Sequence, residues 1–224
     1  MGSKWMATLD PTQDPDLTED DFLGGRVRLL QPRAGYRAGI DPVLLAASVM
    51  ARPGQTVLDM GCGVGAAARC LGRRVSGLSL TGLEVQASYA ALARRNGAAN
   101  GLPFDAQIGD VSDMPDTLKA GQFDHVIANP PYFDRTASTP ALAADKERAT
   151  GEDTPLSIWV RQAAKRAAPG GLVTFIHRAE RLPDLLDHFR QNLGSLEILP
   201  LAPRENRPAR LILVRGRKGG RADF

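Results

Sequence analysis

The stretch Asn129-Pro130-Pro131-Tyr132, which follows the apolar run 123–128, combines residue types that can hold a planar amino group. The Asn129 side chain offers a carbonyl acceptor. The two prolines fix φ and remove two N–H donors, so the Pro130 carbonyl can turn toward the site as a second acceptor. Tyr132 supplies a flat face on which an aromatic ring can stack. The pattern indicates a site where an exocyclic amine is held for attack on an electrophile.

A second candidate site lies at Asp59–Gly65, where an apolar run passes into glycines and then into a helical pattern. Gly61, Gly63 and Gly65 can adopt positive φ and let backbone N–H groups come close to a ligand. In open α/β sheets, ligands bind at such turns, beyond the carboxyl ends of the strands. Cys62 is expected to fill space between the glycines rather than to act as a nucleophile.

The ligand of this turn is expected to be a cation without phosphate. A glycine-rich turn alone also serves nicotinamide and flavin enzymes, but here the spacing differs from their Gly-x-Gly-x-x-Gly fingerprint. Asp59, two residues ahead of Gly61, would repel a pyrophosphate and suits the ammonium and sulfonium of S-adenosylmethionine. Glu84 ends the next predicted strand and suits the hydroxyls of a ribose. Asp110 ends the third, where it could accept from an adenine amino group.

Strand and helix patterns alternate from residue 56 onward. Seven apolar segments predict strands, at 56–60, 78–83, 106–109, 125–129, 172–177, 196–201 and 211–214. Helices are predicted at 41–50, with Asp41 as cap and Pro42 first in the helix, and at 66–73, 86–99, 156–168 and 182–192, and a short strand at 26–31. This order predicts an α/β fold with a Rossmann-like, doubly wound, mostly parallel sheet of seven strands. The last two strands are joined by a loop alone, so an antiparallel edge strand is expected.

Composition restricts the class of protein. The 224 residues are 43% hydrophobic and 24% charged, which fits a globular chain with one domain, expected over residues 22–216. No run reaches the roughly 18 apolar residues of a membrane span, and the N-terminus lacks the order of a signal peptide. Cys62 and Cys70 have no metal-ligand spacing. A cytoplasmic protein with reduced thiols, no metal and no membrane association is expected.

Charge is distributed unevenly along the chain, whose net charge is +3. Residues 1–21 hold six acids against Lys4 and are expected to be disordered, and residues 1–5 are set aside as vector-derived. The remainder carries 27 Lys and Arg against 19 Asp and Glu, and residues 204–221 hold seven bases and one acid. The chain is expected to end in a basic tail at 217–224. A basic body suggests a polyanionic partner, although a solvated surface would have the same composition.

Together these motifs resemble class I S-adenosylmethionine-dependent methyltransferases, and more narrowly the Asn-Pro-Pro-Tyr group that methylates amide or exocyclic amino nitrogens. The matching positions are Asp59–Gly65 for the glycine motif, Glu84 for the ribose-binding acid, Asp110 for the adenine-side acid and Asn129–Tyr132 for the catalytic motif. Gly35–Leu45 resembles the pre-motif of bacterial tRNA (adenine-N6)-methyltransferases, which modify a purine beside the anticodon of a valine tRNA. The resemblance spans residues 22–216.

The resemblance implies methylation of adenine N6 in RNA, in a tRNA anticodon loop, with S-adenosylmethionine as cofactor. It also places Val85, Val111 and Asn129 beside the cofactor. The residues expected to contact the RNA are Tyr36, Arg37, Tyr132, Lys146, Arg148, Arg204, Arg207 and Arg210. The segment 145–153 follows the substrate loop of the subfamily only loosely, with Arg148 as the matching position.

Other functions stay open. A methyltransferase acting on a protein glutamine amide could use the same two acceptors, but such enzymes usually carry an extra N-terminal helical domain. A DNA adenine methyltransferase would usually need an added target-recognition domain. A non-catalytic RNA-binding protein on this fold would be expected to show a broken catalytic motif, and this motif is intact. The three histidines, His125, His177 and His188, are expected to be structural.

Overall fold

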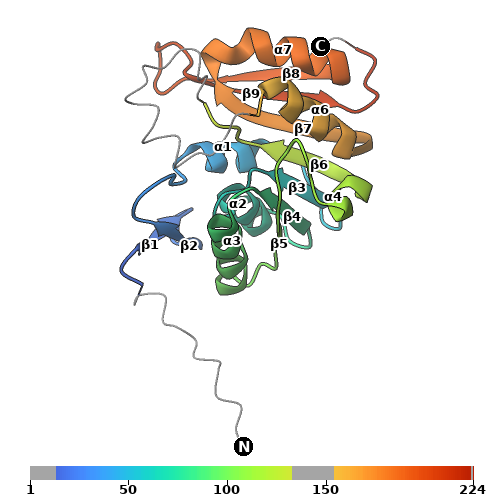
Figure 1. Cartoon of the computed structure of the whole chain (residues 1–224). Coiled ribbons are helices and arrows are strands. Elements are labelled where there is room, and N and C mark those ends of the chain that lie inside the picture. Colours follow the sequence, from blue (N-terminus) through green and yellow to red (C-terminus); the bar gives the residue numbers. More distant parts are fainter. Residues whose placement is uncertain (1–13, 133–153, 223) are drawn as a thin grey trace, which may run out of the picture.

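The computed structural model describes residues 14–132, 154–222 and 224 (Figure 1). A seven-stranded sheet has the order β5-β4-β3-β6-β7-β9-β8, and β1 and β2 form a separate two-stranded sheet. The strands are β1 Leu17–Phe22, β2 Val27–Pro32, β3 Thr56–Met60, β4 Ser79–Glu84, β5 Asp105–Ile108, β6 Phe123–Ala128, β7 Ala167–Arg178, β8 Gly194–Leu201 and β9 Leu211–Arg217. The helices are α1 Asp41–Ser48, α2 Ala66–Arg74, α3 Ala87–Ala99, α4 Asp116–Ala120, α6 Leu156–Arg166, the short 3₁₀ helix η3 Ala179–Arg181 and α7 Leu182–Asn192.

The large sheet is mostly parallel, which confirms the predicted fold class. β3 pairs in parallel with β4 and β6, β4 with β5, and β6 with β7. β9 runs antiparallel to both of its neighbours, β7 and β8. The reversed strand therefore lies one place inside the edge, and β8 forms the edge itself. The short loop between β8 and β9 makes this hairpin, as expected of two strands joined without a helix.

Helices cover both faces of the large sheet, which explains why its strands are almost continuously apolar. Alternate residues of β6 point to opposite faces. Val126 and Ala128 belong to a buried cluster with side chains of α6 and α7. Ile127 belongs to a second cluster with side chains of α1, α2 and α3. Packing on both faces fixes the register of β6 and hence the position of the segment that follows it.

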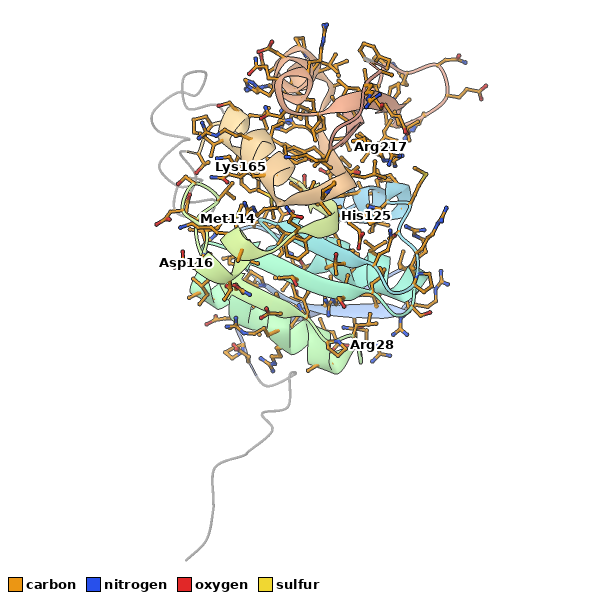
Figure 2. The ribbon with its side chains drawn as sticks, turned by 90° about the vertical axis from the view of Figure 1, so that its right-hand side faces the viewer. Arg28, Met114, Asp116, His125, Lys165 and Arg217 are labelled. Atoms are coloured by element: carbon orange, nitrogen blue, oxygen red, sulfur yellow. The ribbon has the colours of Figure 1, made fainter. Side chains whose placement is uncertain are left out.

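The parallel register brings the ends of the central strands to one edge of the sheet. Met60, the last residue of β3, lies opposite Leu83 of β4 and Ala128 of β6. The glycine turn, Glu84 and Asn129 therefore follow at the same carboxyl edge. Figure 2 views the molecule from the side of the opposite edge, where His125 lies near the start of β6 with its Nε2 3.0 Å from the Gln55 side-chain oxygen.

The prediction of a disordered N-terminal segment is wrong for residues 14–21. β1 pairs with β2 over six positions, from Leu17 opposite Pro32 to Phe22 opposite Val27. Its acids take part in the pairing rather than repelling one another, because Asp20 contacts Arg37 at 2.6 Å and Glu19 and Asp21 lie within 3.7 Å of Arg28. Residues 1–13 lie outside the described part of the chain.

Several boundaries also differ from the predicted ones. Asp41 is the first residue of α1 rather than its cap, and Ile40 occupies the cap position. β9 continues to Arg217, so the predicted basic tail begins inside a strand. The Lys218 N–H donates to the Gly171 carbonyl at 2.9 Å, and its ammonium donates to the Ala164 carbonyl at 2.6 Å. This part of the tail is therefore bound to the body of the protein.

Candidate active site

The turn after β3 has the backbone that its glycines predict. Gly61, Gly63 and Gly65 have φ of 66°, 54° and 83°. Gly65 is the cap residue of α2, and its N–H donates to the Cys62 carbonyl at 2.8 Å. The Cys62 N–H donates to the Leu83 carbonyl at 2.9 Å, which ties the turn to β4. Burial raises the pKa of the Cys62 thiol well above its ordinary value, so this side chain fills space and remains a thiol.

Two of these glycines face aromatic rings. A Cβ on Gly61 would lie 2.6 Å from the Trp159 ring of α6, closer than any side chain could approach. A Cβ on Gly63 would lie 3.5 Å from the Tyr36 ring. Gly61 thus allows the turn to pack on α6, whereas Gly63 keeps its backbone close beneath Tyr36.

Two buried carboxylates flank the turn. Glu84 accepts hydrogen bonds from the N–H groups of Gly63 and Gln86, both at 2.9 Å, and burial raises the pKa of its carboxyl group. Asp59 is 3% exposed and accepts from the Ala68 N–H at 3.3 Å. Burial raises the pKa of Asp59 to about 7. The charge of Arg69 partly opposes this rise, but within the described ranges no lysine or arginine lies at ion-pair distance from Asp59. A cationic ligand would therefore favour the ionised form further.

The predicted adenine-side residues follow β4 and β5. Asp110 closes a turn through one carboxylate oxygen, which accepts from the Ser112 N–H at 2.6 Å and the Ser112 hydroxyl at 2.5 Å. Both bonds use Oδ1, which leaves Oδ2 as an acceptor for a ligand. Val111 is buried and Val85 is half-buried directly after Glu84. All of these residues lie at the carboxyl edge.

The catalytic motif begins directly after β6, with Asn129 half-buried and Pro130 buried. The Asn129 side-chain oxygen accepts from the Tyr132 hydroxyl at 3.0 Å, and its amide nitrogen donates to the Tyr36 hydroxyl at 3.4 Å. The Tyr132 hydroxyl also contacts the Asp41 carboxylate. One hydroxyl proton therefore faces two acceptors, and Asn129 is held between two tyrosines.

Tyr36 connects the glycine turn with the catalytic motif. Its ring lies over Gly63, its hydroxyl contacts Asn129, and its carbonyl accepts from the Tyr89 hydroxyl at 3.0 Å. Burial, with a smaller contribution from the Asp41 charge, raises the pKa of Tyr36 to about 12. The phenol is therefore neutral at neutral pH. Its ring lies between the glycine turn and the Asn-Pro-Pro-Tyr segment, and its hydroxyl can form hydrogen bonds there.

The Tyr132 ring is positioned by neighbours that the sequence did not single out. The His177 ring lies 5.1 Å away at 60°, and the Arg178 guanidinium lies 5.4 Å from the Tyr132 ring centre. Burial, with the charges of Arg181 and Arg178, lowers the pKa of His177 to about 4, so its ring is neutral. Asp41 had a sequence signal as part of the pre-motif, but His177 and Arg178 come from β7 and had none.

The residues predicted to contact RNA are only partly brought to this edge. Arg37 donates to Asp20 at 2.6 Å, to the Thr18 hydroxyl at 2.8 Å and to the Pro32 carbonyl at 2.7 Å, so it fastens β1 to β2 instead of facing the site. Lys146 and Arg148 lie outside the described residues. The exposed residues Arg204, Arg207 and Arg210 belong to the loop between β8 and β9, at the carboxyl edge.

Comparisons with known proteins indicate the family of this chain. Residues 39–149 match the family model "Methyltransferase small domain". A tRNA1(Val) (adenine(37)-N6)-methyltransferase of Porphyromonas gingivalis is 31% identical, with 74% of this chain and 68% of the relative covered. A release factor glutamine methyltransferase of Deinococcus radiodurans is 31% identical, with 73% and 58% covered. The crystal structure of a predicted O-methyltransferase from Agrobacterium tumefaciens has a TM-score of 0.65 and 26% identity, covering 81% of this chain and 82% of that one.

The fold, the glycine turn and its two carboxylates, with the family match, define an S-adenosylmethionine-dependent methyltransferase. The residues present fit that cofactor, because a buried acid without an ion-pair partner suits its cationic groups. The chain belongs to the methyltransferase small-domain family, together with proteins named tRNA1(Val) (adenine(37)-N6)-methyltransferase. The resemblance predicted from the motifs is thereby confirmed, as is the cofactor.

None of the described helices has the length and apolarity to cross a membrane. In the same parts of the chain, no three His, Cys, Asp or Glu side chains are grouped as ligands for a metal ion.

Proposed function

We propose that this protein transfers a methyl group from S-adenosylmethionine to the exocyclic N6 of an adenine in RNA, in a tRNA anticodon loop. The observation that carries the proposal is the placement of Asn129, whose amide lies between Tyr132 and the tyrosine that covers the glycine turn. An acceptor for an amino group thus stands beside the place of the methyl donor. The names of relatives such as the Porphyromonas gingivalis protein support tRNA as the substrate, which is modified in the cytoplasm.

Asn129 would activate the amine by accepting its hydrogen bonds. The N6 lone pair of adenine is delocalised into the ring and is a poor nucleophile. Hydrogen bonds to the Asn129 oxygen and the Pro130 carbonyl strengthen as positive charge develops on that nitrogen, so they stabilise the transition state more than the ground state. The Asn129 oxygen can become free for the amine because Asp41 offers the Tyr132 hydroxyl another acceptor.

The cofactor has a set of residues suited to each of its parts. When bound, S-adenosylmethionine supplies an electrophilic methyl group on a sulfonium. Asp59 would hold the cationic end, Glu84 the ribose hydroxyls through its remaining lone pairs, and Asp110 the adenine amino group. Holding both reactants at one edge supplies much of the barrier reduction by proximity. The nitrogen is positively charged and strongly acidic directly after methyl transfer, so it can release one proton to water without a strong general base.

Features of the surface near the site suit RNA. Tyr132 would stack on the target base, which is worth about 1–3 kcal/mol in single-stranded recognition. A base in an anticodon loop is already partly unstacked, so its extrusion costs less than extrusion from a duplex. The three arginines of the β8–β9 loop, Arg204, Arg207 and Arg210, would contact phosphates.

A second function, methylation of a protein glutamine amide, is favoured by the match to the Deinococcus radiodurans relative. A carboxamide nitrogen is also planar and would use the same two acceptors. Transfer of labelled methyl from S-adenosylmethionine to unmodified tRNA, ribosomal RNA, DNA and protein extract separates the two. We expect label in the tRNA fraction. Label in protein alone would replace the proposal with amide methylation by the same residues.

A further inference from the structure

A hollow opens beside the Asn-Pro-Pro-Tyr segment, at the carboxyl edge of the sheet. It has a volume of about 960 Å³ and is lined by residues of α1, the ends of β7 and β8, the β8–β9 loop, and Tyr132. Asn129 and the glycine turn do not line it. The cavity therefore adjoins the methyl-acceptor site through Tyr132 without being part of the cofactor site.

The register of the sheet explains how distant segments meet there. Arg178 ends β7 and lies opposite Leu211, which starts β9, and Leu211 also pairs with Leu201 at the end of β8. The β8–β9 loop is thus held at the same edge as the start of α1. Figure 1 shows this loop and the N-terminal end of α1 on the same side of the molecule, at the left of the view.

One part of the cavity is lined by apolar side chains and another part by cationic side chains. Ile40 is 60% exposed, and with Leu44 and Pro203 it gives the cavity an apolar wall. Arg178 and Arg210 also line it. The one acid of the lining, Glu180, lies 3.5 Å from the Arg178 guanidinium, so its charge is offset locally.

We propose that this cavity binds a nucleotide that flanks the methylated adenine in single-stranded RNA. Its base would lie against the apolar wall, and its phosphate would contact Arg210 and Arg178. Proteins hold unpaired nucleotides by stacking bases on aromatic rings and on guanidinium groups, and here Tyr132, Arg178 and Arg210 line the cavity beside the apolar wall. A cavity of this size exceeds the roughly 300 Å³ lower bound of small-ligand sites, so a whole nucleotide fits. The assignment deepens the proposed function and rests on it.

The position of Tyr132 connects the two subsites. Its hydroxyl points to Asn129 and Asp41, while its ring also lines the cavity and lies under Arg178. Consecutive bases of a single strand can therefore occupy the acceptor site and the cavity with Tyr132 between them. Occupation of the cavity by the neighbouring nucleotide would then position the target adenine against Asn129.

Two variants test the cavity from the protein side, measured on an anticodon stem-loop RNA that the wild-type protein methylates. Ala209→Trp places a bulky ring into the lining, and Glu205→Trp is its control in the same loop but outside the lining. We expect Ala209→Trp to raise KM for the RNA about tenfold, as loss of one stacked base would. Cofactor affinity and thermal unfolding should match those of the control.

The arginine contact is tested by salt dependence. Arg210→Ala should lower the slope of log affinity against log salt by about 0.7, the value for one phosphate contact in a single strand. Arg190→Ala is the matched control, because Arg190 is exposed near the end of α7, toward the opposite edge of the sheet. The control should keep the wild-type slope.

An abasic scan tests the same assignment without relying on the folding of a variant. The base at each position next to the target adenine is removed in turn, and KM is measured with wild-type protein and with Ala209→Trp. At one neighbouring position, we expect removal of the base to raise the KM of the wild-type protein about tenfold. The same removal should leave the KM of Ala209→Trp unchanged.

The outcomes separate this assignment from the proposed function. The cavity assignment is wrong if the RNA is methylated but removal of each neighbouring base raises KM equally in the wild type and in Ala209→Trp, and if Arg210→Ala keeps the wild-type salt slope. The proposed function would still stand in that case. If the wild-type protein methylates protein and no RNA, the proposed function is wrong and the cavity assignment falls with it.

Discussion

In the proposed function, the chemistry of the site depends on Asn129. Its amide is bound on one side by Tyr36 and on the other by Tyr132. A side chain held on both sides is preorganised, so its oxygen need not reorient when charge develops on a bound amine.

Asn129→Ala removes this acceptor without touching the glycine turn. We expect kcat to fall by about 10²–10³, the effect of losing one preorganised hydrogen-bonding group. The affinity for S-adenosylmethionine should stay within about twofold, since Asp59 and Glu84 are unchanged. Single-turnover transfer and calorimetric binding measure the two quantities. Wild-type turnover in this variant would rule out the acceptor role.

We expect Asp59 to make cofactor binding depend on pH. Burial raises the pKa of its carboxyl group to about 7 in the free protein, so the group is largely protonated below that pH. A cationic ligand favours the ionised form, and binding must therefore displace a proton at low pH. We expect the affinity to fall about tenfold per pH unit below pH 7 and to level off above it.

Calorimetry between about pH 6 and pH 8 checks this dependence. Asp59→Asn is the control, since it should bind more weakly and retain only the titration of the ligand's own amino group. A wild-type affinity that is flat over this range would contradict the role given to the buried charge.

The motifs that could be predicted at this scale are those contiguous in sequence. The glycine turn and the Asn-Pro-Pro-Tyr segment each contain their own signal. His177 and Arg178 contact Tyr132 only because β7 lies beside β6 in the sheet. Such neighbours follow from strand order, which a single sequence does not contain.

At the scale of elements, α6 fixes the glycine turn by packing Trp159 against Gly61. Gly61→Ala combines a positive φ with a Cβ 2.6 Å from that ring, while Gly54→Ala has a positive φ and open space. We expect Gly54→Ala to lower the free energy of unfolding by about 1–2 kcal/mol. Gly61→Ala should lower it by roughly a further 1–3 kcal/mol because of overpacking. If urea unfolding gave the same loss of stability for both variants, the contact between Gly61 and Trp159 would add nothing to the cost of the positive φ.

The β1–β2 sheet depends on Arg37, which was predicted to contact substrate and is instead bound to Asp20 and Thr18. Both ion-pair partners are about one-third exposed, with side-chain accessibilities of 34% and 33%. Arg37→Ala should therefore lower the free energy of unfolding by only about 1 kcal/mol. In a double-mutant cycle with Asp20→Ala the losses should be less than additive. If Arg37→Ala had normal stability but bound RNA more weakly than the wild type, the predicted role of Arg37 in substrate binding would be supported.

Most elements of the large sheet were predictable, because each strand is a short apolar run and each helix has its own periodic pattern. β1 was not, because Leu17–Phe22 contains three acids and one strand of a pair gives little signal without its partner. The five-residue helix α4 was missed because so short a segment carries no periodicity. The position of β9 between β7 and β8 depends on the energies of strand pairing, which the local sequence pattern of a strand does not reveal.

At the scale of the whole molecule, the hairpin of β8 and β9 brings a basic loop to the edge that holds the catalytic motif. Residues 204–221 carry seven bases, and those of the β8–β9 loop are exposed. The sheet thus places the glycine turn, Asn129 and the arginines of the β8–β9 loop at one edge, where the proposed function needs a cofactor site, an acceptor and contacts to phosphate. This arrangement favours a polyanionic substrate approaching the carboxyl edge over a neutral peptide.

The proposed reaction takes place at one atom, the exocyclic nitrogen of an adenine. The most direct measurement is nucleoside analysis of unmodified tRNA after incubation with this protein and labelled S-adenosylmethionine. We expect the label to be recovered in N6-methyladenosine, and we expect Asn129→Ala to slow its formation by about 10²–10³. Recovery of the label in another methylated nucleoside, or in methylglutamine from a protein acceptor with none in RNA, would contradict the proposed function.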